Sequence, residues 1–451
     1  NLLTNSGFDV WSNSTLEDVG SDLSPTSDCT DPDDDQNSTS GWTAAAGSIS
    51  SVAGGETGYM LKVLNDTAGS AQTLATVDAF TALTVGKLYQ LKFSIKNDGV
   101  ANDNVRAFFT GDTGFTAATV TNIDGTWQNI DVVFEAQYAN TAFRFEPLST
   151  MAVSEFYLID NVTLYEVTPG CVASDTLACD GWGKEPAADI YREQWDMTAG
   201  HFGGSYNVQS GSQYSLKIIG TSGGVWDVHW NSGNFKDLQR FCGRTITFGA
   251  WVKTDAANQV QLQIYDDAGN LSANNAGSSW EWLELTKTID ADSGQASVGF
   301  LVDNTKTAYI SQPMLVFGSS IGEGNYTRPQ GEVVNLEQQA LVGTTDALAA
   351  ADDAILNLEA LTDGKIPKGC KAISVNTSVK NSTMADDEGV GWGPDSDDWY
   401  DLRNYPVVSS VYNNIAGRIR CDSNGDIYRR VTESGATISY SAFYILAVEL
   451  R

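Results

Sequence analysis

A set of six segments occurs twice along the chain in the same order, and this repetition constrains the fold more than any other feature. "GYMLKVLNDTAG" (58–69) has a counterpart in "QYSLKIIGTSGG" (213–224), and "VGKLYQLKFSIKND" (85–98) has one in "CGRTITFGAWVKTD" (242–255). The other four pairs begin at residues 104 and 259, 126 and 279, 142 and 297, and 156 and 308. All separations lie between 152 and 157 residues. We therefore predict one folding unit in two copies.

Each repeated segment alternates apolar and polar residues, which indicates a β-strand with one dry and one solvated face. In the second segment, Leu91, Phe93 and Ile95 share one face, while Lys92 and Ser94 share the other. Turns rich in Gly, Asn and Asp separate the segments. Two antiparallel sheets that pack with their dry faces together satisfy this pattern, so each copy is predicted to be a β-sandwich.

Several segments of the first copy resemble a known family. "NLLTNSGFDVW" (1–11), "GKLYQLKFSIK" (86–96), "GTWQNIDVVFEA" (125–136) and "FYLIDNVTLYEV" (156–167) resemble jelly rolls of the carbohydrate-binding-module type, which are related to galactose-binding-like domains. The resemblance covers 1–167 well and 181–318 more loosely. It implies a mainly β fold with tandem jelly-roll sandwiches at 1–167 and 168–328.

The same resemblance implies a structural Ca²⁺ ion. In such modules the acid of the closing "IDNV" strand and groups near the N-terminal "GFD" often hold calcium, which here names Asp160 and Asp9, with Asp78 as a further candidate. The second copy has Gln312-Pro313 where the first has Asp160-Asn161, which weakens the case for a second calcium site. Two other acidic stretches, 27–38 and 422–426, are either calcium loops or, as we expect, solvated loops.

After residue 329 the apolar residues recur every seven positions, which predicts a helix over 329–363 with a narrow apolar seam. A helix of this length gains too little alone and needs a partner surface. That partner is either its own domain or further copies of the helix in a parallel coiled coil, and we expect self-association into a homotrimer because no second amphipathic helix is available. The predicted oligomerisation residues are Val334, Leu341, Leu348, Ile355 and Leu358.

Strand alternation resumes in 364–451, which predicts a small C-terminal β domain with a hairpin turn at Asn424-Gly425. Strand-rich modules beside a short coiled coil resemble trimeric phage fibres and virion decoration proteins. This resemblance is architectural and involves no specific motif.

Composition disfavours several classes of function. The chain has 57 Asp and Glu against 26 Lys and Arg, and its net charge of −31 repels nucleic acid. No stretch approaches the ~20 apolar residues that a membrane-spanning helix needs. The chain has two histidines and no CxxC, GxSxG or HExxH motif. A zinc site or a catalytic nucleophile activated by histidine is therefore not expected. We therefore predict a protein without enzymatic activity, nucleic-acid binding or membrane insertion.

Sugar binding fits the remaining aromatic residues, because flat rings cover the apolar faces of a pyranose while amides bind its hydroxyl groups. "VWDVHW" (225–230) and "SSWEWLEL" (278–285) supply tryptophans, and "QVQLQIYDD" (259–267) supplies a polar face. The candidate glycan-binding residues are Trp226, Trp230, Gln261, Gln263, Tyr265 and Trp282. The alternative is that these tryptophans fill the core or a contact between modules.

Together these patterns predict a virion structural protein, either a trimeric phage fibre or a capsid decoration protein. Its partners would be further copies of itself, other capsid or tail proteins, and surface glycans of the host, and its location would be the extracellular virion. Two alternatives remain: secreted carbohydrate-binding modules detached from a catalytic domain, and a decoration protein without a ligand.

Overall fold

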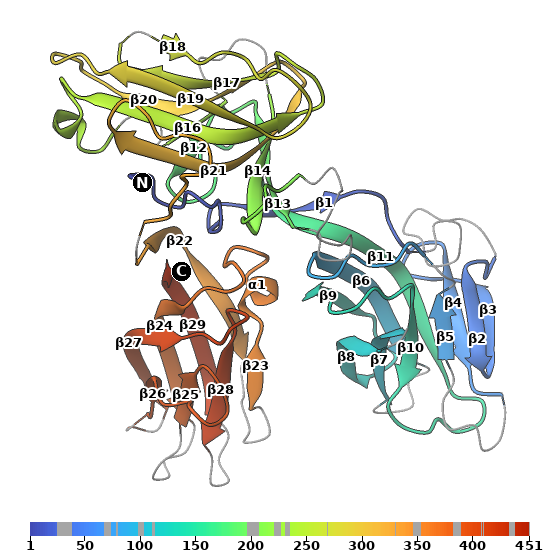
Figure 1. Cartoon of the computed structure of the whole chain (residues 1–451). Coiled ribbons are helices and arrows are strands. Elements are labelled where there is room, and N and C mark those ends of the chain that lie inside the picture. The colour runs from blue at the N-terminus through green and yellow to red at the C-terminus, as the bar shows by residue number, and fades with distance from the viewer. Residues whose placement is uncertain are drawn as a thin grey trace. The chain divides into compact units, whose positions relative to one another are not determined.

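The computed structural model describes the chain except for residues 25–37, 67–73, 78–79, 98–102, 111–112, 196–206, 221–226, 231–234, 268, 330, 346–352, 382–388, 407, 409, 433–437 and 451. Asp18–Val167 form one unit, which we call the N-terminal sandwich. A larger unit combines Asn1–Glu17 with Thr168–Trp195 and Gly204–Arg451. Strands dominate throughout (Figure 1), which confirms the predicted mainly β fold.

The N-terminal sandwich consists of two facing antiparallel sheets around an aromatic-rich core. The first sheet has the order β3 (Ser48–Ala53), β4 (Tyr59–Leu64), β11 (Phe156–Cys171), β6 (Leu88–Asn97) and β9 (Gln128–Glu135), and β1 (Thr15–Val19) also pairs with β11. The second has the order β2 (Trp42–Ala46), β5 (Leu74–Val77), β10 (Ala142–Pro147), β7 (Asp103–Thr110) and β8 (Phe115–Ile123).

The larger unit contains a second sandwich with the same strand order, which we call the central sandwich. Its first sheet runs β13 (Asp189–Gln194), β14 (Tyr214–Ile219), β21 (Thr307–Phe317), β16 (Thr245–Thr254) and β19 (Glu281–Thr288). Its second sheet runs β12 (Trp182–Lys184), β15 (Val228–Trp230), β20 (Ser297–Val302), β17 (Val260–Tyr265) and β18 (Gly269–Leu271). Every strand of these two sheets thus has a counterpart in the N-terminal sandwich, as duplication of one unit requires.

A β-bulge interrupts the closing strand of both copies and corrects their alignment. Asn161 has a φ of 53° where the β11–β6 register shifts, and Gln312 has a φ of 53° where the β21–β16 register shifts. Asp160-Asn161 therefore corresponds to Ser311-Gln312 and not to Gln312-Pro313. The second copy has a serine, Ser311, where the first has Asp160.

The third sandwich, formed by residues 332–450, is the C-terminal sandwich. One four-stranded sheet has the order β22 (Val333–Thr345), β29 (Ile438–Glu449), β24 (Ala372–Asn381) and β27 (Tyr412–Arg420). The other has the order β23 (Ala354–Leu356), β28 (Ile427–Thr432), β25 (Gly389–Gly393) and β26 (Leu402–Asn404), with helix α1 (Leu358–Leu361) following β23. No helix in the described part of the chain is long and apolar enough to cross a membrane.

The predicted coiled-coil helix over 329–363 is wrong. Val334 and Leu341 lie in β22, Ile355 lies in β23 and Leu358 begins α1, while Leu348 is outside the described residues. Because β22 pairs with β29, its backbone groups are satisfied across a sheet and not within a helix. The heptad positions do not form one stripe either: Val334 and Leu358 are buried, whereas Leu341 and Ile355 are 43% and 69% exposed. The predicted homotrimer therefore loses the coiled coil on which it was based.

The first residues of the chain also differ from expectation, because Asn1–Glu17 belong to the larger unit and not to the N-terminal sandwich. Leu3, Phe8 and Trp11 are fully buried in the core of the central sandwich, and Val10 is buried in that of the C-terminal sandwich. The apolar residues of "NLLTNSGFDVW" thus help to hold these two sandwiches together.

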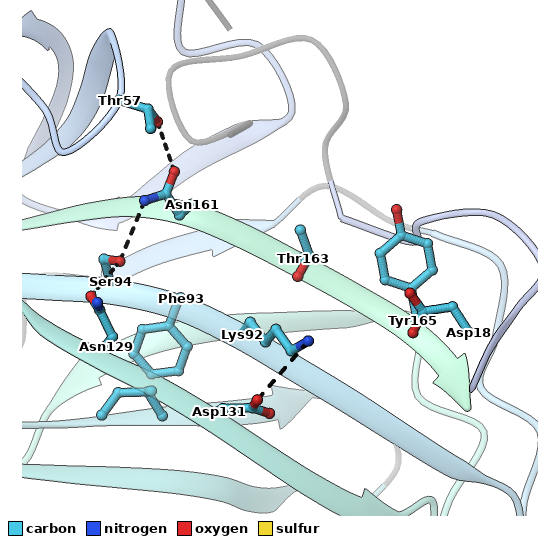
Figure 2. A pocket seen from close by; sticks show the side chains of 11 residues that line it. Asp18, Thr57, Lys92, Phe93, Ser94, Asn129, Asp131, Asn161, Thr163 and Tyr165 are labelled. Carbon is cyan, nitrogen blue, oxygen red and sulfur yellow. Dashed lines mark hydrogen bonds and ion pairs between the residues drawn. The ribbon is translucent and has the colours of Figure 1, made fainter. Parts of the chain in front are cut away.

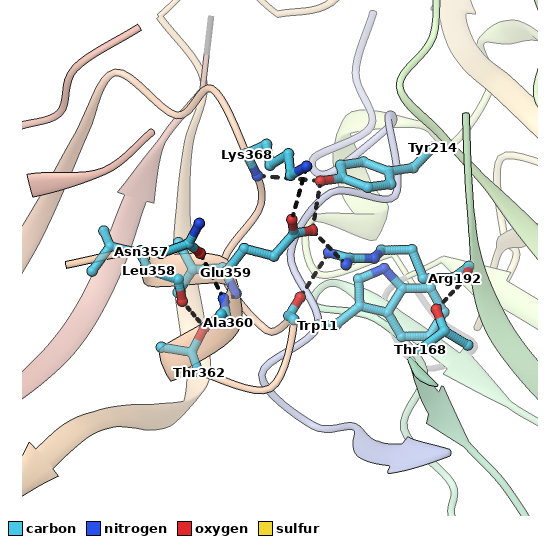
Figure 3. A network of polar contacts seen from close by, with 12 residues as sticks. Trp11, Thr168, Arg192, Tyr214, Asn357, Leu358, Glu359, Ala360, Thr362 and Lys368 are labelled. Carbon is cyan, nitrogen blue, oxygen red and sulfur yellow. Dashed lines mark hydrogen bonds and ion pairs between the residues drawn. The ribbon is translucent and has the colours of Figure 1, made fainter. Parts of the chain in front are cut away.

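A buried ion pair also joins the central and C-terminal sandwiches (Figure 3). Arg192 of β13 lies 2.6 Å from Glu359 of α1, and their side chains are only 1% and 2% exposed. Tyr214 donates a hydrogen bond to the same Glu359 oxygen at 3.0 Å, and the Lys368 ammonium lies 3.8 Å from the other oxygen. Arg192 also donates to the carbonyl of Gly364 at 2.7 Å. We call these groups the junction network.

Replacing Glu359 by alanine should lower the free energy of unfolding of the larger unit by about 3–5 kcal/mol, because Arg192 is left buried without a counter-charge. The control is Glu449→Ala, which removes an ion pair with Arg418 whose side chains are 29% and 52% exposed. It should cost less than about 1 kcal/mol. Denaturant unfolding of both variants measures the difference, and equal costs would contradict the role of the junction network.

A buried histidine makes the stability of the central sandwich depend on pH. Burial lowers the pKa of His229 in β15 from 6.5 to about 4. Between these values the unfolded chain takes up a proton that the folded chain does not, so stability falls as the pH decreases from 6.5 to 4. The loss from this residue should be about 3 kcal/mol. As the pH falls from 6.5 to 4, the free energy of unfolding of the parent protein should therefore fall relative to that of the His229→Gln variant. A difference in unfolding free energy that does not depend on pH would contradict this.

Candidate functional site

An open groove of about 670 Å³ lies on the outer face of the first sheet of the N-terminal sandwich (Figure 2). The residues that line it come from β1, β6, β9 and β11 and from the turn before β4. They are Asp18, Thr57, Lys92, Phe93, Ser94, Asn129, Ile130, Asp131, Asn161, Thr163 and Tyr165. Most of these side chains are polar.

Strand alternation sends these polar side chains outward. Leu91 and Phe93 of β6 are buried in the core, so Lys92 and Ser94 between and beside them face the groove. On β11 the bulge at Asp160 and Asn161 shifts the register by one position. The left-handed conformation of Asn161 then turns its amide toward Ser94.

One end of the groove carries a cluster of polar side chains that hold each other in place. Asn161 donates to Glu56 Oε2 at 3.0 Å and accepts from the Thr57 hydroxyl at 2.7 Å. Ser94 Oγ lies 2.5 Å from the same Glu56 oxygen and 2.9 Å from Asn129 Oδ1, so its hydroxyl can donate to either. These contacts fix the directions of the amides before any ligand arrives, which reduces the entropy cost of binding.

The rest of the groove combines charged groups with aromatic rings. The Lys92 ammonium lies 4.0 Å from the carboxylate of Asp131, and both side chains are about half exposed. Tyr165 and Asp18 line the opposite end from the Asn161 cluster (Figure 2). On the same outer face of β6, the Lys96 ammonium lies 4.4 Å from the centre of the Trp127 ring. The face thus presents aromatic rings as well as hydrogen-bonding groups.

The implied calcium ligands Asp160 and Asp9 belong to different units of the chain. Asp160 is fully buried behind the groove, its oxygens accept hydrogen bonds from the backbone N–H groups of Thr57 and Asn161, and burial raises its pKa. Asp9 belongs to the larger unit, where it forms an ion pair with Arg328 at 2.8 Å. A neighbouring guanidinium opposes cation binding at Asp9. Within the described residues no group of three or more acids, histidines and cysteines is arranged to hold a metal, and Asp78 lies outside them.

The five described residues of the six predicted to bind glycan are not brought together in the central sandwich. Trp230 is 7% exposed and packs in the core against Phe235 at 5.6 Å, whereas Trp226 lies outside the described residues. Gln261, Gln263 and Tyr265 lie on β17 in one sheet, while Trp282 lies on β19 in the other. The Gln261 amide donates to the backbone of Ser272, so part of its hydrogen-bonding capacity is used within the fold.

Sequence reasoning missed the partner of Trp282, which is Trp251. The two tryptophans are cross-strand neighbours on β16 and β19, with ring centres 6.0 Å apart in an edge-to-face arrangement. Trp282 lies over Gly249 and donates its indole N–H to Glu284 at 3.1 Å. In the central sandwich, Trp251 has Ser311 opposite it on one neighbouring strand and Trp282 on the other. In the N-terminal sandwich, Ser94 has Asp160 and Asn129 opposite it in the same way. The positions held by Trp251 and Trp282 in the second copy are thus held by the polar residues Ser94 and Asn129 in the first.

Further aromatic and cationic side chains form a cross-strand row on the neighbouring strands of the same sheet. The Lys253 ammonium lies 5.8 Å from the ring centre of Tyr309 on β21. Burial raises the pKa of the Tyr309 hydroxyl to about 12. Lys217 of β14 lies 5.3 Å from the ring of Tyr191 on β13. The pairing of the repeats described above would have aligned Ser94 with Trp251, so a signal for this face was present in the sequence.

No protein-family model and no curated protein sequence match the chain. Among solved structures, it is similar to the tandem CBM22-1–CBM22-2 domain of Xyn10C from Paenibacillus barcinonensis, with 12% identity, 67% of this chain and 99% of that chain covered, and a TM-score of 0.29. The N-terminal cellulose-binding domain of Cellulomonas fimi β-1,4-glucanase C shows 17% identity, coverages of 29% and 91%, and a TM-score of 0.24.

A phage protein also appears among the similar structures. Tailspike protein 4 of bacteriophage CBA120 shows 15% identity, 32% of this chain and 21% of that chain covered, and a TM-score of 0.25. Likenesses as distant as these three assign no function to this chain.

The contact between Gly249 and Trp282 generates a prediction. A Cβ atom at position 249 would lie 2.4 Å from the Trp282 ring, so Gly249→Ala must displace that ring from the sheet. We expect a changed near-ultraviolet circular dichroism spectrum and a loss of about 1–3 kcal/mol in unfolding free energy. Gly277→Ala is the control, because a Cβ there meets nothing within 4 Å. If both variants kept the spectrum of the parent protein, the ring would not lie as described.

Proposed function

We propose that the chain is a non-catalytic glycan-binding protein whose principal site is the groove of the N-terminal sandwich. The observation that supports this most directly is the fixed cluster of Asn129, Asn161, Ser94 and Glu56 on an open sheet face. Planar amides and carboxylates bind pairs of neighbouring hydroxyl groups, and each sugar ring presents several such pairs.

The aromatic rings of the same face complete the match to a sugar. Tyr165 lines the groove, and the ring of Trp127 lies beside Lys96 on the outer face of β6. Such rings cover the apolar C–H surface of a pyranose while the polar cluster binds its hydroxyl groups. The groove is open to solvent, so an oligosaccharide can lie along it without a change in the backbone.

Charge narrows the class of glycan. Lys92, Asp18 and Asp131 line the groove, Glu56 contacts its Ser94, and the whole chain carries a net charge of −31. An acidic protein repels polyanions at low ionic strength. The proposed ligand is therefore a neutral oligosaccharide and not a sulfated or otherwise polyanionic one.

The sheet face of the central sandwich that carries Trp251 and Trp282 is a second proposed site for the same class of ligand. Trp251 and Trp282, with Tyr309 nearby on β21, offer stacking surface where the N-terminal groove offers amides. The two copies would then differ in affinity and in the sugars they prefer. Two weak sites in one chain increase the avidity for a surface that displays many glycans.

The setting in which this binding takes place stays a prediction. A homotrimer on a virion, with contacts to capsid or tail proteins, depended on a coiled coil that the described residues do not form. Adhesion by a virion protein and attachment by detached secreted modules both use the binding chemistry proposed here. A structural Ca²⁺ ion likewise stays a prediction.

The decisive experiment is a glycan array with the intact protein, followed by calorimetry with the best neutral oligosaccharide. Asn129→Ala and Tyr165→Ala should each weaken binding about 5- to 10-fold or more, because each removes a direct contact worth about 1 kcal/mol or more. The matched control is Tyr138→Ala, which removes a tyrosine that is 39% exposed but does not line the groove.

In the same assay, Trp282→Ala distinguishes binding at the tryptophan pair of the central sandwich from binding at the groove of the N-terminal sandwich. A glycan that loses affinity only in this variant binds the central sandwich. If the protein bound no neutral glycan, or if all four variants bound as the parent does, the proposed function would be wrong.

A further inference from the structure

Two thiols face each other at one end of the C-terminal sandwich. The Sγ atoms of Cys370 and Cys421 are 3.6 Å apart, and both cysteines are free. The backbone N–H of Cys421 donates to the carbonyl of Lys371 at 2.8 Å, which extends the β24–β27 ladder beyond the pair Ala372–Arg420. The closeness of the two sulfur atoms is thus set by paired strands and not by loose loops.

The two cysteines differ in exposure. Cys370 is 1% exposed, and its thiol also contacts the carbonyl of Gly425 at 3.6 Å, whereas Cys421 is partly exposed. A small reagent therefore reaches Cys421 first. Its hydrogen bond with Cys370, its burial and the charges of Asp422 and Asp426 raise the pKa of the Cys421 thiol. This disfavours the thiolate, so we expect no fast nucleophilic chemistry and faster exchange at alkaline pH.

We propose that Cys370 and Cys421 form an intramolecular disulfide when the protein meets a small-molecule disulfide such as oxidised glutathione. Side-chain rotation must shorten the sulfur separation from 3.6 Å to the ~2.05 Å of a disulfide. This inference is independent of the proposed glycan binding, because it depends only on the C-terminal sandwich.

The reaction proceeds in two exchange steps. The Cys421 thiolate attacks one sulfur of oxidised glutathione, which gives a mixed disulfide and releases one glutathione thiolate. The Cys370 thiol, on losing its proton, then attacks Cys421 Sγ and releases the second glutathione. Two protein thiols are oxidised, one molecule of oxidised glutathione is reduced to two thiols, and the two protons pass to the glutathione sulfur atoms.

The bond would close a connection across 51 positions of sequence, next to the junction network. Gly369 donates its N–H to the carbonyl of Asn424 at 2.6 Å, and Lys368 donates its N–H to the Tyr214 hydroxyl at 3.2 Å. The segment that contacts Tyr214 and Glu359 would thus be covalently attached to the strand end at Cys421. Oxidation should therefore stabilise the contact between the central and C-terminal sandwiches as well as the C-terminal sandwich itself.

The test uses the full chain, incubated at pH 8.5 with either reduced or oxidised glutathione and then alkylated. Peptide mapping by mass spectrometry should find a Cys370–Cys421 linked peptide only in the oxidised sample. The melting temperature of the larger unit should rise by roughly 5 to 10 °C on oxidation, because the cross-link restricts the unfolded chain.

Cys421→Ser should abolish the linked peptide and the rise in melting temperature. Cys242→Ser is the matched control, since Cys242 is also partly exposed but its thiol contacts only the Ser293 carbonyl at 3.9 Å among the described contacts. This variant should respond to oxidation as the parent does. The proposal is overturned if both thiols of the folded, oxidised protein are alkylated separately, or carry glutathione without forming the bond. The peptide map of the parent protein decides this even if Cys421→Ser does not fold.

Discussion

The groove of the N-terminal sandwich depends on strands that pack one face into the core and turn the other face away from it. In β6, Leu91, Phe93 and Ile95 fill the core, and that packing alone determines that Lys92 and Ser94 point away from it. Hydrophobic packing on one side of the sheet therefore determines which side chains line the groove on the other side. A residue on the outer face can change its chemistry without disturbing the core, which suits a binding surface.

The two copies illustrate this freedom. Their strand order is the same and both keep the bulge at Asn161 and Gln312, yet Ser94 and Asn129 of one copy correspond to Trp251 and Trp282 of the other. A left-handed residue at the bulge is a backbone requirement, and it is kept by two different amides. The cross-strand pair beside it is not a requirement of the fold, and it is polar in one copy and aromatic in the other.

Alternation of apolar and polar residues predicted the two repeated sandwiches, because that pattern reports directly on burial, and the recurrence of six segments in the same order predicted their duplication. It could not separate a heptad from a strand in β22. Positions seven apart fall on one side of a helix but on opposite sides of a regular strand, and only the pairing with β29 decides between them. Trp230 shows a related limit: a tryptophan on an alternating strand is equally compatible with the core, where it lies, and with a binding face.

The junction network lay beyond prediction for a different reason. Arg192, Tyr214 and Glu359 are separated by up to 167 positions, and nothing in the local sequence around any of them signals burial of a charge. Their proximity follows from how two sandwiches pack, which a pattern along the chain does not record. The contact between Asn129 and Ser94, by contrast, lies between two directly paired strands, β9 and β6, each of which falls in a segment predicted to be a strand.

The path of the first 17 residues has a consequence for biosynthesis. Asp18–Val167 can fold as soon as they leave the ribosome, but Leu3, Phe8 and Trp11 pack against strands that are translated much later. During that interval these three apolar side chains have no native core to pack into, and they must be covered by other parts of the chain or by chaperones. Contacts of high sequence separation form slowly, so those between Asn1–Glu17 and the central sandwich should form after the contacts within Asp18–Val167.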